Sequence, residues 1–281
     1  MRASGEDLHS EVVAFNVDDD GFDLFRAALL IGRVEEPDLN VEAVSRQVAE
    51  IAASVRMRME SAGPWPEALA LLVDELFTER GFKGDRDEYD APRNSFLHEV
   101  LRTRRGLPIT LSLLFIEVAR RAGIDAFGIP FPGHFLVGVR GSGGDGTVDV
   151  VVVDPFHAGR LRSVTDLERH LSRLAGKETA LAAEHLMPAE PRAVLERMLY
   201  NLRSSYVRRG DVQHLARVLS RLLILRPKDG VLSLERARAR RLLLDDEGAA
   251  SDARQALASE ETEEEATAML ALLDEERAHQ H

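Results

Sequence analysis

The stretch that decides the fold is Arg105-Gly106-Leu107-Pro108-Ile109-Thr110-Leu111-Ser112-Leu113-Leu114-Phe115-Ile116-Glu117-Val118-Ala119-Arg120-Arg121-Ala122-Gly123-Ile124. Pro108 suits the first position of a helix, because its missing N–H would have no intrahelical partner there. Gly123 suits the position just past a helix end, where a left-handed residue closes the last turn. Polar residues are few before Arg120, so the sequence predicts a buried helix at the centre of a domain.

Strands follow this helix. Residues 126–129, 134–139 and 148–153 have the short apolar patterns of strands, and the glycine-rich segment 141–146 predicts a hairpin loop between the last two. His134 begins one strand of the hairpin and Asp154 follows the other. We therefore expect these two side chains to lie close together.

Upstream of the central helix the sequence predicts a polar leader over residues 1–21 and then a helical subdomain. Apolar residues recur at helical spacing from Phe22, over 41–59 and over 67–79. Asn94 or Ser95 is a candidate cap for a short helix that ends at Arg102.

Downstream, the sequence predicts helices from Leu161 to the C-terminus, with a boundary near 188–191. Two helix pairs follow tetratricopeptide-like spacing, although Gly210 and Gly248 are 38 residues apart against a period of about 34. The acidic tail, 260–281, predicts an exposed terminal helix. The expected organisation is a leader, an α+β domain over 22–187 and a tetratricopeptide-like region over 188–281.

Composition limits the possible functions. The 281 residues include no cysteine, which excludes disulfides, thiolate metal sites and thiol nucleophiles. The net charge of −12 argues against general nucleic-acid binding, which needs a basic surface. The basic runs 102–105 and 236–241 lack interleaved aromatic residues, so they are interpreted as solvated helix faces.

No apolar run approaches the roughly 20 residues that cross a bilayer, and the acidic N-terminus has no apolar core typical of a secretory signal. We therefore expect a cytoplasmic protein with no membrane association and no cofactor.

Several short sequences resemble those of the bacterial SirB1 family. They are Gly81-Phe82, Tyr89, Pro92, Asn94-Ser95, Gly106 to Ser112, Pro132-Gly133-His134-Phe135-Leu136-Val137 and Asp154-Pro155-Phe156. That family pairs a transglutaminase-like domain with tetratricopeptide-like helices, and the resemblance covers roughly residues 22–275. It implies a papain-like or transglutaminase-like α+β core, with a central helix and a small antiparallel sheet.

The resemblance also assigns the positions of a catalytic triad. In active transglutaminase-like enzymes a Gly-x-Cys begins the central helix; here the matching frame is Gly106-Leu107-Pro108. His134 and Asp154 match the other two triad members. Acyl transfer through a thioester needs a thiolate at the helix N-terminus. Proline offers no nucleophile. The resemblance therefore implies a protein that has the fold and two of the triad residues but cannot carry out the superfamily's usual thiol reaction.

Two other chemistries find little support in the sequence around this site. Ser112 shares the helix face of Pro108 but lies about 6 Å further along the axis, beyond hydrogen-bond reach of a histidine that meets position 108. Thr110 should point away from that face. A metal site would gather His134, Asp154 and His157, yet the sequence has no His-x-x-x-His spacing and no thiolate. No metal is predicted.

Three functions remain open. The first is a non-catalytic transglutaminase-like protein that binds a protein partner through its cleft or its tetratricopeptide-like helices. The second is a hydrolase of altered chemistry in which His134 and Asp154 activate water. The third is a scaffold in which the triad remnants are structural and only the helical repeat binds. Accessibility of His134 in an open cleft would favour the second.

Overall fold

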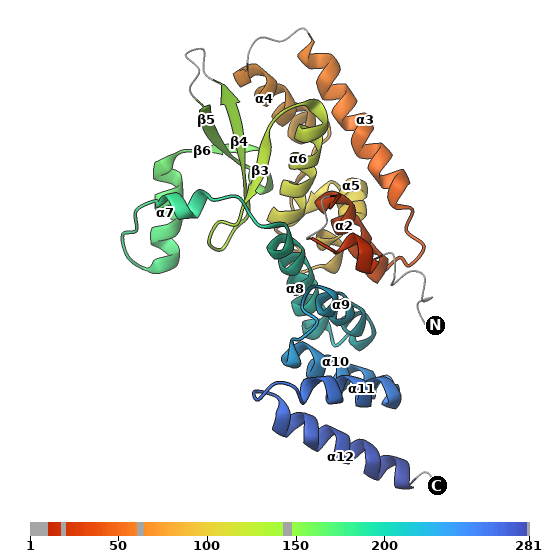
Figure 1. The fold of residues 1–281 in the computed structure, drawn as a ribbon. Coiled ribbons are helices and arrows are strands. Elements are labelled where there is room, and N and C mark those ends of the chain that lie inside the picture. The colour runs from red at the N-terminus through yellow and green to blue at the C-terminus, as the bar shows by residue number, and fades with distance from the viewer. Residues whose placement is uncertain (1–10, 18–20, 61–64, 143–147, 280–281) are drawn as a thin grey trace. The chain divides into compact units, whose positions relative to one another are not determined.

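A computed structural model describes residues 11–17, 21–60, 65–142 and 148–279. Within these ranges the chain forms two compact units (Figure 1). We call them the core unit, residues 24–32 and 38–194, and the repeat unit, residues 1–23, 33–37 and 195–281. The α+β class predicted from the sequence is confirmed, since helices surround a small antiparallel sheet.

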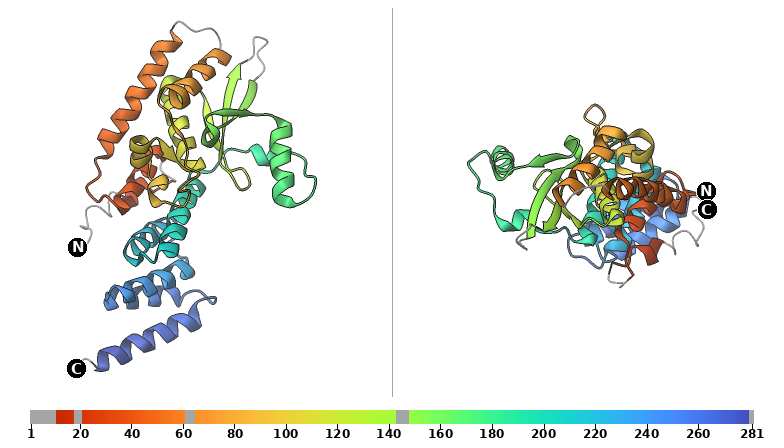
Figure 2. Two further views of the ribbon diagram at one scale, coloured as in Figure 1. Left: turned by 180° about the vertical axis from the view of Figure 1, so that it is seen from behind. Right: turned by 90° about the horizontal axis from the view of Figure 1, so that it is seen from above.

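Helix α6 (Pro108–Ala122) is the centre of the core unit. Its bounds agree with the prediction: Pro108 occupies the first turn and Gly123 adopts φ 87° just past the end. Twelve of its fifteen residues are buried. Figures 1 and 2 show α6 between α3 (Val41–Met59) and the sheet, as expected for a helix that is apolar on nearly every side.

The sheet has the order β3-β4-β5-β6, with every pair antiparallel. The strands are β3 (Ala126–Ile129), β4 (Leu136–Ser142), β5 (Val148–Asp154) and β6 (Arg160–Arg162). Leu136 and Val152 pack with helix α7 (Val164–Ala175) on one face of the sheet. The next residue on each strand, Val137 and Val153, is fully buried and points to the other face. This alternation follows from the two-residue period of a strand.

Short elements complete the core unit. They are α2 (Leu24–Leu30), η1 (Ile31–Val34), α4 (Trp65–Val73), the π-helical η2 (Asp74–Glu79), β1 (Lys83–Gly84), η3 (Pro92–Ser95), α5 (Leu97–Thr103), β2 (Arg105–Gly106), η4 (Pro155–His157) and η5 (Ala183–Leu186). Strands β1 and β2 pair in parallel, which places Gly84 opposite Gly106.

The repeat unit is helical and its members follow one another in a stack (Figure 1). It contains α8 (Pro191–Arg209, shared at its start with the core unit), α9 (Val212–Leu225), α10 (Gly230–Leu242), α11 (Asp246–Ala256) and α12 (Glu263–His279). Residues 11–14 form a helical turn in which Glu11 is buried and bonded to Arg221 at 2.6 Å. Residues 11–17 of the predicted polar leader thus contain a helical turn and the buried Phe15, while residues 1–10 and 18–20 lie outside the described residues.

Three predictions of local structure were wrong. Residues around Leu161 form strand β6 rather than the start of a helix, because the left-handed residues Ala158 and Gly159 turn the chain back along β5. Neither Asn94 nor Ser95 caps α5: both lie in η3, and the extended Phe96 precedes the helix without a side-chain cap. The acidic tail is not wholly exposed, since α12 buries Leu273. Of the predicted hairpin loop, 141–146, Gly141 and Ser142 belong to β4 and residues 143–146 lie outside the described residues; β4 begins at Leu136 rather than at His134, which lies in the turn before it.

Candidate functional site

The carboxylate of Asp154 is the centre of the site. Strand β5 ends at this residue, and its side chain is fully buried. Oδ1 accepts from Nε2 of His134 at 2.9 Å, and Oδ2 accepts from Nδ1 of His157 at 2.8 Å and from Arg162 at 2.8 Å. A buried charge is costly unless such partners surround it.

Electrostatics keep this carboxylate ionised. Burial raises the pKa of Asp154. The hydrogen bond from His134 and the charges of His134, His157 and Arg162 lower it by more than burial raises it, so the pKa is about 2. An ionised carboxylate can only accept hydrogen bonds. Nε2 of His134 therefore donates in this hydrogen bond, and Nδ1 is the other ring nitrogen.

His134 is positioned by the turn that leads into β4. Its backbone N–H donates to the carbonyl of Phe131 at 2.9 Å, and Gly133 before it adopts φ 65°. Its side chain is about nine-tenths buried. Within the described part of the chain, no hydrogen bond is made to Nδ1 of His134. The ring thus has one nitrogen fixed by Asp154 and one without a protein partner in these ranges.

Aromatic contacts connect His134 to the start of the central helix. The ring of Phe156 packs edge-on against His134, with 6.0 Å between centroids. The same ring covers Gly84, where an added Cβ would lie 2.5 Å from it. Gly84 pairs with Gly106 in β2, two residues before Pro108. This chain of contacts joins the His134–Asp154 pair to the N-terminus of α6.

Pro108 is buried in the first turn of α6 and offers no nucleophile. Leu107 precedes it as the N-cap, and its N–H donates to Thr110 Oγ1 at 3.0 Å. Thr110 in turn donates to the carbonyl of Asn94 at 2.8 Å, so this hydroxyl fixes the helix start. Ser112 is fully buried and its Oγ donates to the carbonyl of Phe135 at 3.4 Å. Its hydrogen bond is therefore to the backbone beside His134 and not to the ring.

Sequence reasoning found His134 and Asp154 and missed the rest of the carboxylate's surroundings. Arg162 lies on β6, in a segment for which the sequence predicted a helix. The Ala158-Gly159 pair followed by Arg160-Leu161-Arg162 is the signal for this second hairpin. His157 was considered only as a metal ligand, whereas its ring and backbone N–H both donate to Asp154.

A cation is a poor fit for this cluster. Ligand atoms of His134, Asp154 and His157 lie within 4.8 Å of one another. However, the guanidinium of Arg162 already lies 2.8 Å from Asp154 Oδ2, and a metal ion would be repelled by this positive charge. The hydrogen bonds to the carboxylate account for the arrangement.

The arginines of the basic run 102–105 contact neighbouring side chains of the chain. Arg102 pairs with Glu99, Arg104 lies over the ring of Phe82, and Arg105 approaches Asp85. None of the described helices has the length and apolar character needed to cross a bilayer.

Comparisons with known proteins identify the relatives of the chain. The profile described as the transglutaminase-like superfamily matches residues 42–200. A UPF0162 protein of Xylella fastidiosa is 39% identical over 215 residues, covering 75% of this chain and 74% of that protein. A UPF0162 protein of Pseudomonas aeruginosa is 31% identical over 188 residues, or 67% and 66% of the two chains.

A eukaryotic relative matches a shorter part. F-box only protein 21 of Homo sapiens is 33% identical over 139 residues, which are 48% of this chain and 21% of that protein. No solved structure matches the chain significantly.

Proposed function

Because this chain belongs to the transglutaminase-like superfamily and to the UPF0162 proteins, we propose that it is a non-catalytic member that acts as a protein-binding or regulatory module. One observation carries the proposal: Pro108 begins the central helix at the position that the resemblance gives to the nucleophile, and the chain has no cysteine. The resemblance gives His134 and Asp154 to the other two triad positions, where they have no thiol to activate.

The short sequence motifs around Pro108, His134 and Asp154 support assignment of the chain to the SirB1 family. We also propose a cytoplasmic location. The His134–Asp154 pair then acts as a structural element that holds β4, β5 and β6 together through one buried carboxylate. Partner binding is assigned to the surface of either unit. F-box only protein 21 shows that a domain of this kind occurs within a larger protein whose name denotes an F-box.

A restored thiol tests the placement of Pro108. The variant P108C contains the chain's sole cysteine, so its thiolate can be titrated without background, by ultraviolet absorbance or by the rate of alkylation. We expect a thiol pKa well below the usual value of about 8.5, because the helix N-terminus and His134 favour the thiolate. The matched control P108C/H134A should return the thiol pKa toward 8.5. An ordinary thiol pKa in P108C would contradict the placement.

Activity of the native chain tests the absence of catalysis. Wild-type protein incubated with a glutaminyl peptide and hydroxylamine should form no hydroxamate. Hydroxamate formation by the wild type, abolished in H134A, would refute a non-catalytic function.

A hydrolase of altered chemistry is the second candidate, and it is favoured by Nδ1 of His134, to which none of the described residues makes a hydrogen bond. A histidine with Asp154 on Nε2 is arranged as a general base toward water. The burial of His134 disfavours it, since substrate and water need access. Hydrolysis of an activated ester by the wild type, lost in H134A and retained in S112A, would support this candidate. The third possibility, a scaffold that binds only through its helical repeat, predicts that H134A lowers stability without altering partner binding.

A further inference from the structure

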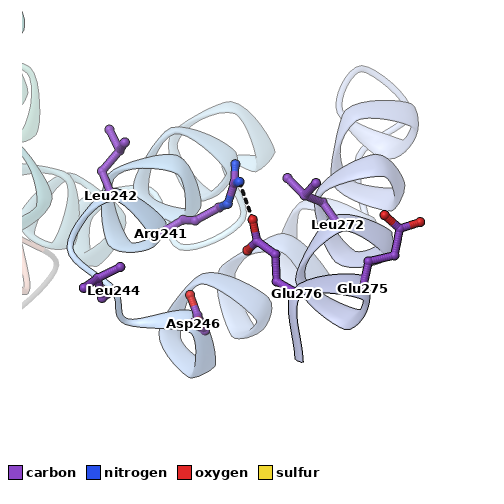
Figure 3. Close-up of a pocket in the computed structure, with 7 residues that line it drawn as sticks. All are labelled: Arg241, Leu242, Leu244, Asp246, Leu272, Glu275 and Glu276. Carbon is purple, nitrogen blue, oxygen red and sulfur yellow. Dashed lines mark hydrogen bonds and ion pairs between the residues drawn. The ribbon is translucent and has the colours of Figure 1, made fainter. Parts of the chain in front are cut away.

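The repeat unit has a groove formed by the end of α10, the turn into α11 and the last turns of α12 (Figure 3). Its volume is about 750 Å³. It combines three leucines with three acidic residues and one arginine: Arg241, Leu242, Leu244, Asp246, Leu272, Glu275 and Glu276. We call this the C-terminal groove. All seven residues lie within the repeat unit.

The leucines of the groove are unusually exposed. Leu242 is 72% exposed and Leu244 is 88% exposed, so both large apolar side chains lie almost entirely in solvent. Leu272 on α12 adds a third apolar side chain across the groove (Figure 3). Exposed apolar side chains that share a groove with charged residues are a candidate interaction site.

Leu244 also has an unfavourable backbone. It adopts φ 61° in the turn after α10, a left-handed conformation that glycine or asparagine usually occupies. The leucine side chain therefore does not stabilise the fold, because it is exposed to solvent and leucine disfavours this backbone conformation. Strained backbone is concentrated at functional positions, so Leu244 points to a role in contact with another molecule.

The rim of the groove is negative. Arg241 is paired with Glu276 at 2.7 Å, so the single cation of the lining is neutralised within the groove (Figure 3). Asp246 and Glu275 add two further carboxylates. The segment that carries the groove is acidic overall: residues 230–279, from α10 to α12, contain thirteen acidic side chains and six basic ones.

We propose that the C-terminal groove binds an amphipathic segment of a partner protein, in which leucine-like side chains are flanked by lysine or arginine. The apolar side chains would cover Leu242, Leu244 and Leu272, and the cations would meet the acidic rim. This inference rests on the proposed function and names the partner chemistry of that function. Second copies of the chain and acidic segments are the competing occupants.

Three labelled peptides separate these occupants by fluorescence anisotropy with the full chain. The first is a helix-forming peptide of leucine at positions i, i+3, i+4 and i+7 with lysine elsewhere. The second replaces every lysine by glutamate, and the third scrambles the order of the first. We expect saturable binding of the first peptide, weakened by salt, and far weaker binding of the other two.

Leu244→Gly is the decisive variant. It removes the exposed side chain and supplies the residue that suits φ 61°, so the melting temperature should stay the same or rise. Affinity for the leucine–lysine peptide should fall by about tenfold, the effect of losing one buried leucine contact. Val231→Ala is the matched control: it shortens an exposed side chain on α10 outside the groove and should leave affinity unchanged. Asp246→Asn should reduce both the affinity and its salt dependence.

Several results would overturn the inference. These are equal binding of the lysine and glutamate peptides, unchanged affinity in Leu244→Gly, and concentration-dependent self-association that Leu244→Gly abolishes while no peptide binds. The last would mean that copies of the chain meet at the groove. None of them affects the hydroxamate assay, whereas hydroxamate formation by the wild type would refute the proposed function without any change in peptide binding.

Discussion

The ring of His134 donates through Nε2 to the carboxylate of Asp154, 20 residues further along the chain and at a distance of 2.9 Å. The pair has the arrangement of a general base and its orienting acid. The same carboxylate also accepts from His157 and Arg162, which come from η4 and β6. Asp154 therefore joins three successive segments of the sheet region, and its loss should affect stability as much as any chemistry.

The first prediction concerns stability at low pH. The pKa of Asp154 is about 2 in the folded chain against an ordinary 3.8, so the native state favours the carboxylate. Its contribution, about 2 kcal/mol, is complete above roughly pH 4 and is lost as the pH falls toward 2. Urea unfolding across this range should show the loss. Asp154→Asn should be less stable at neutral pH, and its free energy of unfolding should not show this decrease as the pH falls toward 2.

A second prediction concerns stability in a higher pH range. Burial lowers the pKa of His157 below its ordinary 6.5, despite the opposing charge of Asp154. A depressed pKa in the folded state means that stability decreases as the pH falls below 6.5. His157→Gln should flatten the profile there while leaving the lower window in place. Parallel profiles for the wild type and both variants would show that the two groups are not linked to folding.

A third prediction concerns Arg162. Its guanidinium donates to Asp154 from a side chain that is 17% exposed, and Ala at this position would leave the buried carboxylate with fewer donors. We expect a loss of about 2 kcal/mol in the free energy of unfolding and a higher pKa for Asp154. The matched control is Arg160→Ala on the same strand, an exposed residue 3.7 Å from Asp166, which should cost little. Equal effects of the two substitutions would contradict the assignment.

A fourth prediction concerns the contact between Gly84 and Phe156. A Cβ at position 84 would lie 2.5 Å from the Phe156 ring, which packs against His134. Gly84→Ala should destabilise the chain by about 1–3 kcal/mol, because the ring has to move. The histidine Cε1–H resonance of His134 should shift as well. The double variant Gly84→Ala/Phe156→Leu should recover part of the stability; a purely additive loss would show that the ring is not the obstacle.

A fifth prediction concerns the repeat unit. Asp252 on α11 is buried and accepts from Arg236 at 2.6 Å and from Arg240 at 2.9 Å, both on α10. Asp252→Ala leaves two arginines without their carboxylate and should cost about 3–5 kcal/mol. Glu265→Ala, which removes an exposed partner of Arg238, is the control and should change stability by less than about 1 kcal/mol. Thermal unfolding of the two variants would separate these outcomes.

The central part of the fold was predictable because its signals are local. Pro108 and Gly123 mark the ends of α6 through backbone chemistry that does not depend on tertiary contacts. Helix α3 was likewise predicted with its observed bounds from one apolar stripe. The proximity of His134 and Asp154 followed from the pairing of two adjacent strands, β4 and β5, in a hairpin.

Long-range contacts were not predictable in this way. Asn94 has the residue type of a cap, yet its carbonyl accepts from Leu107 and Thr110, and its amide donates to Glu88. Arg162 has the residue type of a solvated surface, yet it meets a carboxylate eight positions away after a left-handed turn. In both cases the role of the residue is determined by its contact partner in the fold. A single sequence does not reveal which residue that partner is.

Pro108 also has a genetic consequence. No proline codon becomes a cysteine codon by a single base substitution, so every route back to a thiol passes through another residue, such as serine or arginine. Arginine would place a charge at a buried helix start, which the fold opposes. Serine adds no charge and is common at helix N-termini, so it is the one-base neighbour of proline that would bring a hydroxyl to the start of α6 with the least conflict.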